Sequence, residues 1–455
     1  MKYPVYPEMK NSGIEWLGEI PEHWEVSKFK WLFTLIYRYP TYYGIKYEDT
    51  GVIEVRGEML KKGYIDLSKE PRYISKKTSS RFPKTILSKG DIVMSVRGTM
   101  GKIGLVKEEL EGANITANLL KLSPKRQLIN SKWLSIILNS NLFEGILNNV
   151  STQTTIKTIT VPELGSIQMP VPPIKEQKAI AIFFDKETGR IDQLIDKKEQ
   201  LIELLQEKRQ ALISQAVTKG LNSDVPMKDS GIEFLGEIPE QWEITQLKRI
   251  QAKEEYSFVD GPFGSDLKNE EYTDDGIPLI QLNNIKIGEH VIQNTNYISE
   301  EKARELYKHN IFPGDIVIAK MADPVARAAI VKSVYGKYVI VADCVKLSPN
   351  IKKINRDFLV YSINSKFIRQ EAEKVSSGTT RLRISLGELK NLKILLPPIE
   401  EQQQIADYLD KETSKIDTLV EKVTQQISNL KEYRQALISN AVTGKIDVRE
   451  VYQDE

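Results

Sequence analysis

The stretch that decides the fold is residues 10–25, KNSGIEWLGEIPEHWE, because it occurs twice in the chain. Residues 228–243 read KDSGIEFLGEIPEQWE, 218 positions further along. Self-similarity at a fixed separation is the signature of a duplicated structural unit. The 455 residues therefore predict two related halves.

Further matches between these anchors indicate that a whole half is duplicated, and most of them lie 225 positions apart. They are PPIxEQ at 172–177 and 397–402, RQALIS at 209–214 and 434–439, GDIV at 90–93 and 314–317, and KLSP at 121–124 and 346–349. The segments between the matches have diverged. The second half also carries a longer insertion near residues 261–265.

Within each half the pattern of residues changes once. Short β-rich runs over residues 26–170 alternate with Gly, Asn, Pro and Ser clusters, which indicates a mainly β domain with a few helices. After the Pro-Pro pair the pattern is helical over 174–217, and in the second copy over 399–442. Two equal long helices, each with one apolar seam, favour a coiled coil in which the two seams face each other. The alternative is that each helix packs only onto its own β-rich domain.

A seven-residue register predicts the side chains of that seam. They are Phe184, Ile191, Lys198, Leu205 and Leu212 with Glu187, Leu194, Leu201, Lys208 and Gln215 in the first helix, and Leu409, Ile416, Val423, Leu430 and Leu437 with Glu412, Leu419, Gln426, Tyr433 and Asn440 in the second. The predicted fold class is α+β, with two mainly β domains joined by two long coiled-coil helices in a pseudo-twofold internal repeat. The predicted bounds are 1–170 and 221–395 for the domains, 171–220 and 396–444 for the helices, and 445–455 for a C-terminal tail.

Composition excludes several classes of protein. One cysteine and three histidines, scattered along the chain, provide no metal-ligand spacing and make a zinc framework untenable. The longest apolar run, residues 179–184, is far shorter than the ~20 residues of a membrane span. Residues 1–7 do not resemble a secretory signal, which predicts a cytoplasmic protein.

Catalytic signatures are also missing. Residues 323–326 (DPVA) lack the second proline and the aromatic residue that an amino-methyltransferase uses to hold a flipped base. Residues 97–102 resemble the end of a phosphate loop, but Val96 replaces its first glycine and Ile103 replaces its Ser/Thr. The triplet 196–198 (DKK) lies in the middle of a long helix, where a solvated face is the simpler interpretation. The sequence therefore predicts a binding protein that has no cofactor and no metal, and not an enzyme.

Basic residues are concentrated in the first half. Residues 28–160 carry 22 Lys/Arg against 11 Asp/Glu, whereas residues 245–385 carry 21 against 18. Such a block is expected of a protein that binds a polyanion. A solvated basic surface without a partner is the alternative.

The paired SGIExLGEIPExW segments, GDIV through RGTMGKIG at 90–104, and DGPFGS at 260–265 together resemble the specificity subunit of a type I restriction-modification system. The resemblance covers nearly the whole chain. It implies that each β-rich block is a target-recognition domain for one half of a split double-stranded DNA site. It also implies that the two long helices form an antiparallel coiled coil that spaces the two domains. It also implies that two methylation subunits dock on this frame and that two restriction subunits join through them, with nothing catalytic in this chain. The alternatives are a coiled-coil scaffold for proteins alone, a specificity module of another methylation-linked nuclease type, and a self-sufficient methyltransferase or nuclease.

Residue chemistry suggests which side chains contact DNA. Glycines in the turn at 97–102 let the backbone approach phosphate, and the neighbouring cations neutralise it. Arginine suits guanine in the major groove, and Gln or Asn suits adenine. The predicted DNA-binding residues are Tyr42, Arg56, Arg97, Thr99, Lys102 and Lys157 in the first half, and Lys268, Gln281, Asn283, Lys320, Arg327, Arg381 and Arg383 in the second. Ordinary loop charges and polar sheet surface are the alternatives for these positions, while Trp24 and Trp242 are predicted to pack.

Overall fold

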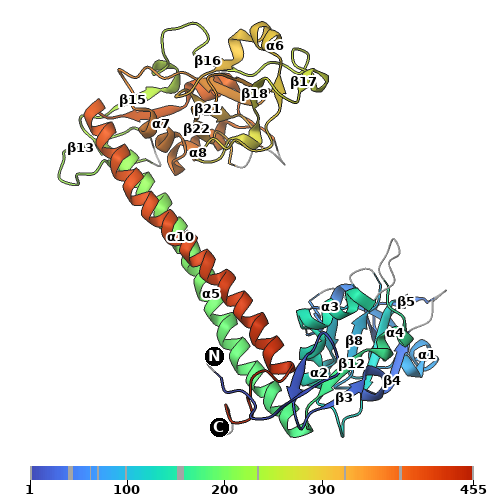
Figure 1. Cartoon of the computed structure of the whole chain (residues 1–455). Helices are drawn as coiled ribbons and strands as arrows, with labels where there is room; N and C mark the ends of the chain where they lie inside the picture. Colours follow the sequence, from blue (N-terminus) through green and yellow to red (C-terminus); the bar gives the residue numbers. More distant parts are fainter. Residues whose placement is uncertain are drawn as a thin grey trace. The chain divides into compact units, whose positions relative to one another are not determined.

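The computed structural model describes residues 3–38, 45–61, 63–68, 71–97, 100–150, 158–232, 235–321, 324–378 and 382–452. The chain divides into two compact units, Met1–Lys198 with Gln425–Glu455 and Glu199–Thr424. Each unit contains one β-rich domain and parts of both long helices, α5 (Ile174–Lys219) and α10 (Ile399–Val442) (Figure 1). The helices thus begin at the predicted residues, and α5 continues to Lys219.

The two domains have matching orders of elements. The first has strands β1 (Met9–Asn11), β2 (Glu19–Pro21), β3 (Glu25–Lys28), β4 (Phe33–Arg38), β5 (Tyr47–Glu48), β6 (Val52–Val55), β7 (Arg72–Ile74), β8 (Ile92–Ser95), β9 (Ile103–Leu105), β10 (Asn114–Ile115), β11 (Leu119–Pro124) and β12 (Gln168–Val171), and helices α1 (Lys76–Ser80), α2 (Ser131–Leu138), α3 (Asn141–Val150) and α4 (Val161–Ser166).

The second has strands β13 (Met227–Asp229), β14 (Glu237–Pro239), β15 (Glu243–Gln246), β16 (Phe258–Asp260), β17 (Tyr272–Thr273), β18 (Ile277–Ile280), β19 (Tyr297–Ile298), β20 (Asn310–Ile311), β21 (Ile316–Ala319), β22 (Ala328–Ile330), β23 (Tyr338–Ile340), β24 (Cys344–Leu347) and β25 (Lys393–Leu396), and helices α6 (Glu300–Glu305), α7 (Arg356–Ile363), α8 (Lys366–Val375) and α9 (Leu386–Asn391).

One four-stranded antiparallel sheet is built identically in both domains. Its strand order is β4-β11-β8-β9 in the first and β16-β24-β21-β22 in the second. The register corresponds as well, because Leu120 pairs with Arg38 in the first sheet and Val345 with Asp260 in the second. A second sheet differs, with order β10-β6-β7-β5 in the first domain and β17-β19-β18-β23-β20 in the second. The shared sheet therefore allows residues of the two domains to be compared position by position.

The GDIV and KLSP motifs contact each other, which explains why both recur. Lys121 Nζ lies 3.2 Å from Asp91 Oδ2, and both side chains are buried. In the second domain burial lowers the pKa of Lys346 and raises that of Asp315, while each charge favours the ionised form of the other. Lys346 Nζ also donates to the carbonyl oxygen of Asn310 at 2.8 Å. These motifs are part of the scaffold.

The other two repeated motifs form a joint where the long helices meet each domain. Trp24 Nε1 donates to Glu176 Oε1 at 3.0 Å, and Trp242 Nε1 donates to Glu401 Oε2 at 3.0 Å. Both tryptophans are fully buried, in agreement with the predicted packing role. A carboxylate at the start of each long helix therefore holds the repeated N-terminal segment of its own unit.

The end of the other long helix lies on the same tryptophan. A Cβ on Gly444 would come within 3.3 Å of Trp24, and one on Gly220 within 3.3 Å of Trp242. Both glycines have left-handed backbone angles, φ +73° and +74°, which end a helix at little cost only for glycine. In each unit, therefore, one tryptophan contacts the beginning of one long helix and the end of the other.

The glutamines of the PPIxEQ motifs fix the next element of each domain. Gln177 and Gln402 are fully buried. The backbone N–H of Asn130 donates to Gln177 Oε1 and that of Asn355 to Gln402 Oε1, each at 2.8 Å. Asn130 and Asn355 are in turn the N-caps of α2 and α7. The motif therefore connects each long helix to the helical layer of its domain.

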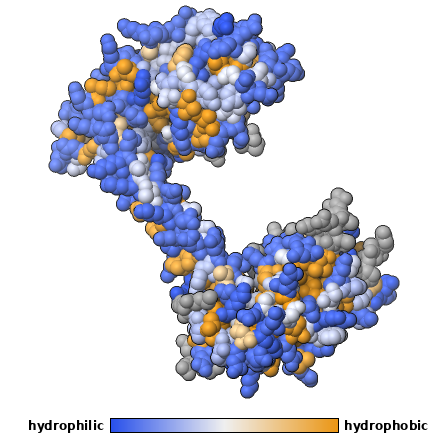
Figure 2. Space-filling view, in the orientation of Figure 1, coloured by the Kyte–Doolittle hydropathy of each residue, from blue (hydrophilic) through white to orange (hydrophobic). Residues whose placement is uncertain are grey.

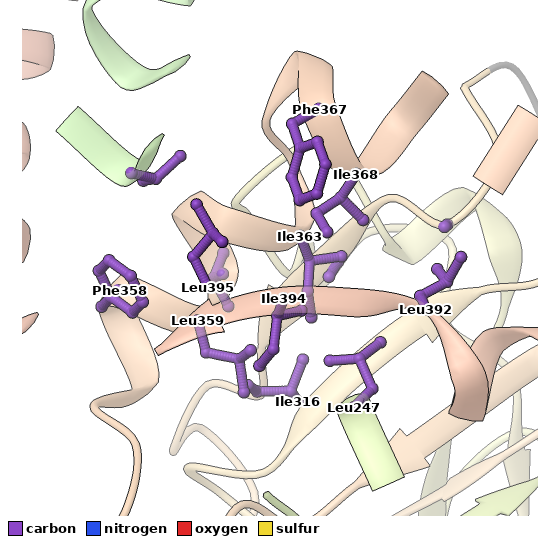
Figure 3. Close-up of a cluster of buried hydrophobic side chains, with 14 of the residues drawn as sticks. Leu247, Ile316, Phe358, Leu359, Ile363, Phe367, Ile368, Leu392, Ile394 and Leu395 are labelled. Carbon is purple, nitrogen blue, oxygen red and sulfur yellow. The ribbon is translucent and has the colours of Figure 1, made fainter. Parts of the chain in front are cut away.

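A continuous hydrophobic core joins the sheet and helices of the second unit. Ile394 and Leu395 of β25 lie among side chains of α7 such as Ile363 (Figure 3). These three side chains are at most 1% exposed. Burial of such a side chain contributes about 1.5–3 kcal/mol. The same cluster includes Ile213 of α5 and Leu409 of α10, so the ends of both helices pack onto this domain.

Within each unit α5 and α10 also pair with each other. Arg434 Nε lies 3.2 Å from Asp192 Oδ1 in the first unit, and Arg209 Nε lies 3.0 Å from Asp417 Oδ1 in the second. From the first ion pair to the second, the residue number rises from 192 to 209 in α5 and falls from 434 to 417 in α10. The two helices are therefore antiparallel. The alternative that each helix packs only onto its own domain is therefore wrong.

The predicted seam is half right. Its first set is mainly buried, at Phe184, Ile191, Leu409, Ile416, Val423 and Leu437. In the second set Glu187 is buried, but the predicted leucines Leu194, Leu201 and Leu419 are 42%, 42% and 47% exposed. Ile195, which follows Leu194, and Ile427, which follows Gln426, are buried instead. The seam residues thus follow a spacing of four and three, and a shift of one residue turns a side chain by about 100° around the helix.

Candidate nucleic-acid interface

In the first domain the described candidates lie around the turn between β8 and β9. Arg97 is exposed and forms an isolated β-bridge with Thr158. Lys102 is exposed, and its backbone N–H donates to Ser95 Oγ at 2.9 Å. Arg56 is mostly buried, with 18% of its side chain exposed, and it forms an ion pair with Glu58. Tyr42, Thr99, Lys157 and Arg381 were also predicted and lie outside the described residues.

In the second domain several candidates have contacts that shape the fold. Arg327 donates from Nε to the carbonyl oxygen of Ile285 at 2.6 Å and from NH2 to that of Leu282 at 2.8 Å. Gln281 Oε1 accepts from Asn296 Nδ2 at 3.2 Å. Asn283 and Lys268 are exposed. The exposed side chains are therefore the better placed for an external ligand.

Lys320 and Arg383 lie close together at one corner of the shared sheet. Lys320 Nζ lies 2.9 Å from Asp260 Oδ2, and Arg383 NH2 lies 2.5 Å from Asp343 Oδ1. The two pairs are adjacent, because the backbone N–H of Lys320 donates to the carbonyl oxygen of Asp343 at 2.7 Å. Arg383 is the outermost of the four, with 55% of its side chain exposed. With Met321, which forms a β-bridge with Arg383, these residues define the variable corner of the second unit.

The register of the sheet identifies the same corner in the first unit. Arg38 takes the place of Asp260, as the pairing with Leu120 and Val345 shows. The backbone N–H of Val96 donates to the carbonyl oxygen of Asn118 at 3.0 Å, as that of Lys320 does to Asp343. The Arg97–Thr158 bridge corresponds to the Met321–Arg383 bridge. The variable corner of the first unit is therefore Arg38, Val96, Arg97, Asn118 and Thr158.

The two corners share a backbone and differ in chemistry. Asn118 and Asp343 both adopt a left-handed conformation, with φ of 70° and 66°. Such a conformation is uncommon outside glycine and is enriched at functional sites. Each bridge carries one arginine, but on opposite sides: Arg97 on the β8 side of the first bridge and Arg383 on the far side of the second.

Sequence reasoning missed Arg38, Asn118, Asp260 and Asp343. Asp260 begins the DGPFGS motif, but that motif does not indicate which residue of the first half corresponds to it, because the offset between the halves changes from 222 to 225 across the corner. Strand register aligns them, and it becomes visible only when the sheet is formed.

The described residues contain no group of three or more His, Cys, Asp or Glu placed to hold a metal ion. Burial raises the pKa of the Cys344 thiol to about 12, which opposes a role as a nucleophile. None of the described helices has the length and apolar character that crossing a membrane requires.

Two related β-rich domains, each with a polar corner on a common frame, define a tandem binding protein. The chain belongs to the type I restriction modification DNA specificity domain family, whose model matches residues 21–204 and 262–429. The MjaVIII type I restriction enzyme specificity subunit of Methanocaldococcus jannaschii is 26% identical over 386 residues, which are 83% of this chain and 85% of the relative. The EcoKI specificity subunit of Escherichia coli is 22% identical, over 94% of this chain and 90% of the relative.

Solved structures agree on the fold. A chain from a study of complex assembly and conformational transition of the type I R-M system has a TM-score of 0.70 at 17% identity, covering 93% of this chain and 98% of that chain. The HsdS subunit from Thermoanaerobacter tengcongensis has a TM-score of 0.56 at 17% identity, covering 94% and 98%. The predicted fold class, with two mainly β domains and two long helices in an internal repeat, is confirmed.

Proposed function

We propose that this chain is the DNA-specificity subunit of a type I restriction-modification complex. Each β-rich domain reads one half of a bipartite double-stranded site. The chain itself is not an enzyme and needs no cofactor, because methylation and restriction subunits that associate with it carry out the chemistry. The complex works on DNA in the cytoplasm.

The observation that carries this proposal is the pair of variable corners. A reader of two different half-sites needs one backbone frame that presents two sets of side chains, since base edges are distinguished by the donors and acceptors offered to them. The corners meet this requirement, because their hydrogen-bonded frame is shared while all five side-chain positions differ. A scaffold for proteins alone would not require this difference.

The long helices provide equivalent surfaces for partners. Leu194 of α5 and Leu419 of α10 occupy the same position of the repeat, and both are exposed. Hydrophobic patches interrupt the mainly hydrophilic visible face of the helices (Figure 2). A surface presented twice suits two copies of one partner. We therefore assign two methylation subunits to the helices, with two restriction subunits joining through them.

Joining two weak readers raises their combined affinity. Once one domain has bound, the second contact becomes intramolecular, which increases avidity by roughly 10²–10⁴ when the geometry fits. The helices 174–219 and 399–442 would then set the length of the unspecified spacer between the half-sites. Neither domain needs to bind tightly alone.

An exchange experiment tests the proposal. The chain is purified with its methylation partner, and residues 28–160 are replaced by the equivalent block of a relative. Methylation of a randomised DNA library should change in one half of the recognised motif only. A change in both halves would rule out modular reading, and methylation by the isolated chain would show that the chemistry belongs to this subunit.

A further inference from the structure

The Lys320–Asp260 ion pair is not required by the fold. Lys320 is only 8% exposed, and at its position the first unit has Val96, which is fully buried. The first unit has Arg38 in place of Asp260, so the same sheet corner forms without this pair. Replacement of a buried ion pair by hydrophobic residues is often neutral or stabilising. The requirements of the shared backbone therefore do not account for the charges of the second corner.

Asp343 is held in place beside Arg383. Its left-handed backbone conformation, φ 66°, costs more than an extended one and fixes the direction of the side chain. Among the described residues, the buried Oδ1 atom has Arg383 NH2 as an ion-pair contact at 2.5 Å but no donor with hydrogen-bond geometry. When this ion pair opens, the carboxylate needs a new donor, which the edge of a base can provide.

The chemistry of the two side chains matches the two bases of one pair. In the major groove a carboxylate accepts from the N4 amino group of cytosine, and an arginine donates two hydrogen bonds to O6 and N7 of guanine. Arg383 is more than half exposed and Asp343 lies directly beside it. Lys320, whose backbone N–H donates to the carbonyl oxygen of Asp343, pairs with the carboxylate of Asp260.

We propose that Arg383 and Asp343 read a G·C base pair in the second half-site, and that their ion pair opens when DNA binds. This inference rests on the proposed function. In the first unit the equivalent of Asp343 is Asn118, whose amide suits adenine. The two corners therefore read different base pairs with the same backbone.

The test uses the chain with its methylation partner and a library randomised at each position of both half-sites. Asp343→Asn copies the residue of the first unit, and Asn tolerates the left-handed conformation. The preference for G·C should fall by about ten- to a hundred-fold at one position of the second half-site, with all other positions unchanged. The reciprocal change, Asn118→Asp, should alter one position of the first half-site only.

Two controls separate base reading from other effects. Glu300→Gln removes an exposed ion pair with Lys337 in the same unit and should leave every preference unchanged. The salt dependence of binding should also be unchanged in Asp343→Asn, because that slope reports contacts to phosphate.

The outcomes distinguish this inference from the proposed function. If the unmodified complex has no sequence preference, the proposed function is wrong. If it is specific, and folded Asp343→Asn and Asn118→Asp complexes keep every preference, the assignment of the corner is overturned. Equal weakening on all sequences by Arg383→Ala, with a shallower salt slope, would likewise overturn it and place Arg383 on phosphate.

Discussion

The two units solve the same structural problem with different side chains, and the comparison separates scaffold from specificity. Residues that recur in both units, such as Trp24 and Trp242 with Glu176 and Glu401, contact each other and hold the long helices on the domains. Residues at the same corner of the shared sheet differ in charge and size. Residues that are the same in both units therefore belong to the structural frame. Residues that differ at equivalent backbone positions are the candidates for recognising different half-sites.

The two units also differ at equivalent positions outside the variable corners. His290 in the second unit takes the place of Ile65 in the first, as the bridges Ile285–His290 and Leu60–Ile65 show. Asp357 takes the place of Lys132. The second unit thus carries titratable groups where the first has an apolar side chain or an opposite charge. Four predictions test the differences between the two units.

The largest effect is expected from Gly261→Ala, in the insertion that distinguishes the second unit. A Cβ at this position would lie 1.9 Å from the carbonyl oxygen of Val341, so the backbone must move. We expect a loss of about 3 kcal/mol or more in the free energy of unfolding, measured by denaturant titration. Gly264→Ala is the matched control, because nothing lies within 4 Å of its Cβ. Equal stability of the two variants would contradict the close approach.

The second prediction concerns acid sensitivity. Burial lowers the pKa of His290 to about 4, and Lys332 adds to the shift. The folded state thus holds this proton less tightly than the unfolded state, so stability is fully present above pH 6.5 and falls as the pH drops towards 4. The loss is roughly 1.4 kcal/mol for each pH unit in that window.

His290→Ile, which copies Ile65, should remove most of this dependence. The unmodified chain and the variant are compared by thermal unfolding between pH 4 and 7. A steep acid loss that survives the substitution would assign the proton uptake to other groups.

The third prediction compares the two joints. Glu176 accepts hydrogen bonds from Trp24, Tyr6 and His23. At the second joint, the hydrogen bond that the described residues show to Glu401 comes from Trp242. A hydrogen bond to a charged group contributes about 1.5–3 kcal/mol. Glu176→Gln should therefore destabilise its unit more than Glu401→Gln does, by about 1–2 kcal/mol.

Amide hydrogen exchange over residues 3–38 reports the stability of the first joint, and exchange over residues 235–260 reports that of the second. His23→Gln, which makes the first joint resemble the second through Gln241, should remove part of the difference. Identical effects of the two Glu→Gln changes would show that the extra donors add nothing.

Much of the frame was predictable from sequence because its signals are local or repeated. The Pro-Pro start, the absence of breakers and the closing glycines predicted both long helices. The seam failed at Leu194 and Leu201, because leucine on an exposed face is indistinguishable by type from leucine in a seam. Ile195 is buried instead, and the local pattern does not indicate which of the two neighbouring residues is covered.

The corner was less predictable, for a different physical reason. Lys320 and Arg383 were predicted to bind DNA, but their ion-pair partners Asp260 and Asp343 lie far apart in sequence. Only the register of β16, β21 and β24 brings these residues together. The predicted roles of Arg97, Lys102 and the other described candidates stay predictions.

The smallest effect is expected where α2 and α7 face the long helices. In the first unit Lys132 Nζ lies 2.9 Å from Asp185 Oδ1. In the second unit the same positions hold Asp357 and Asp410, and burial together with the Asp410 charge raises the pKa of Asp357. Because the folded state binds this proton more tightly, its contribution to stability is present at low pH and is lost as the pH rises.

Asp357→Lys should reproduce the ion pair of the first unit and stabilise the second by a few tenths of a kcal/mol, up to about 1, at pH 7. Both partners are partly exposed, so the gain should shrink in high salt. Urea titrations at low and high salt measure it, with Lys132→Asp as the reverse change in the first unit. A gain that does not depend on salt would mean that helix propensity, and not charge, is responsible.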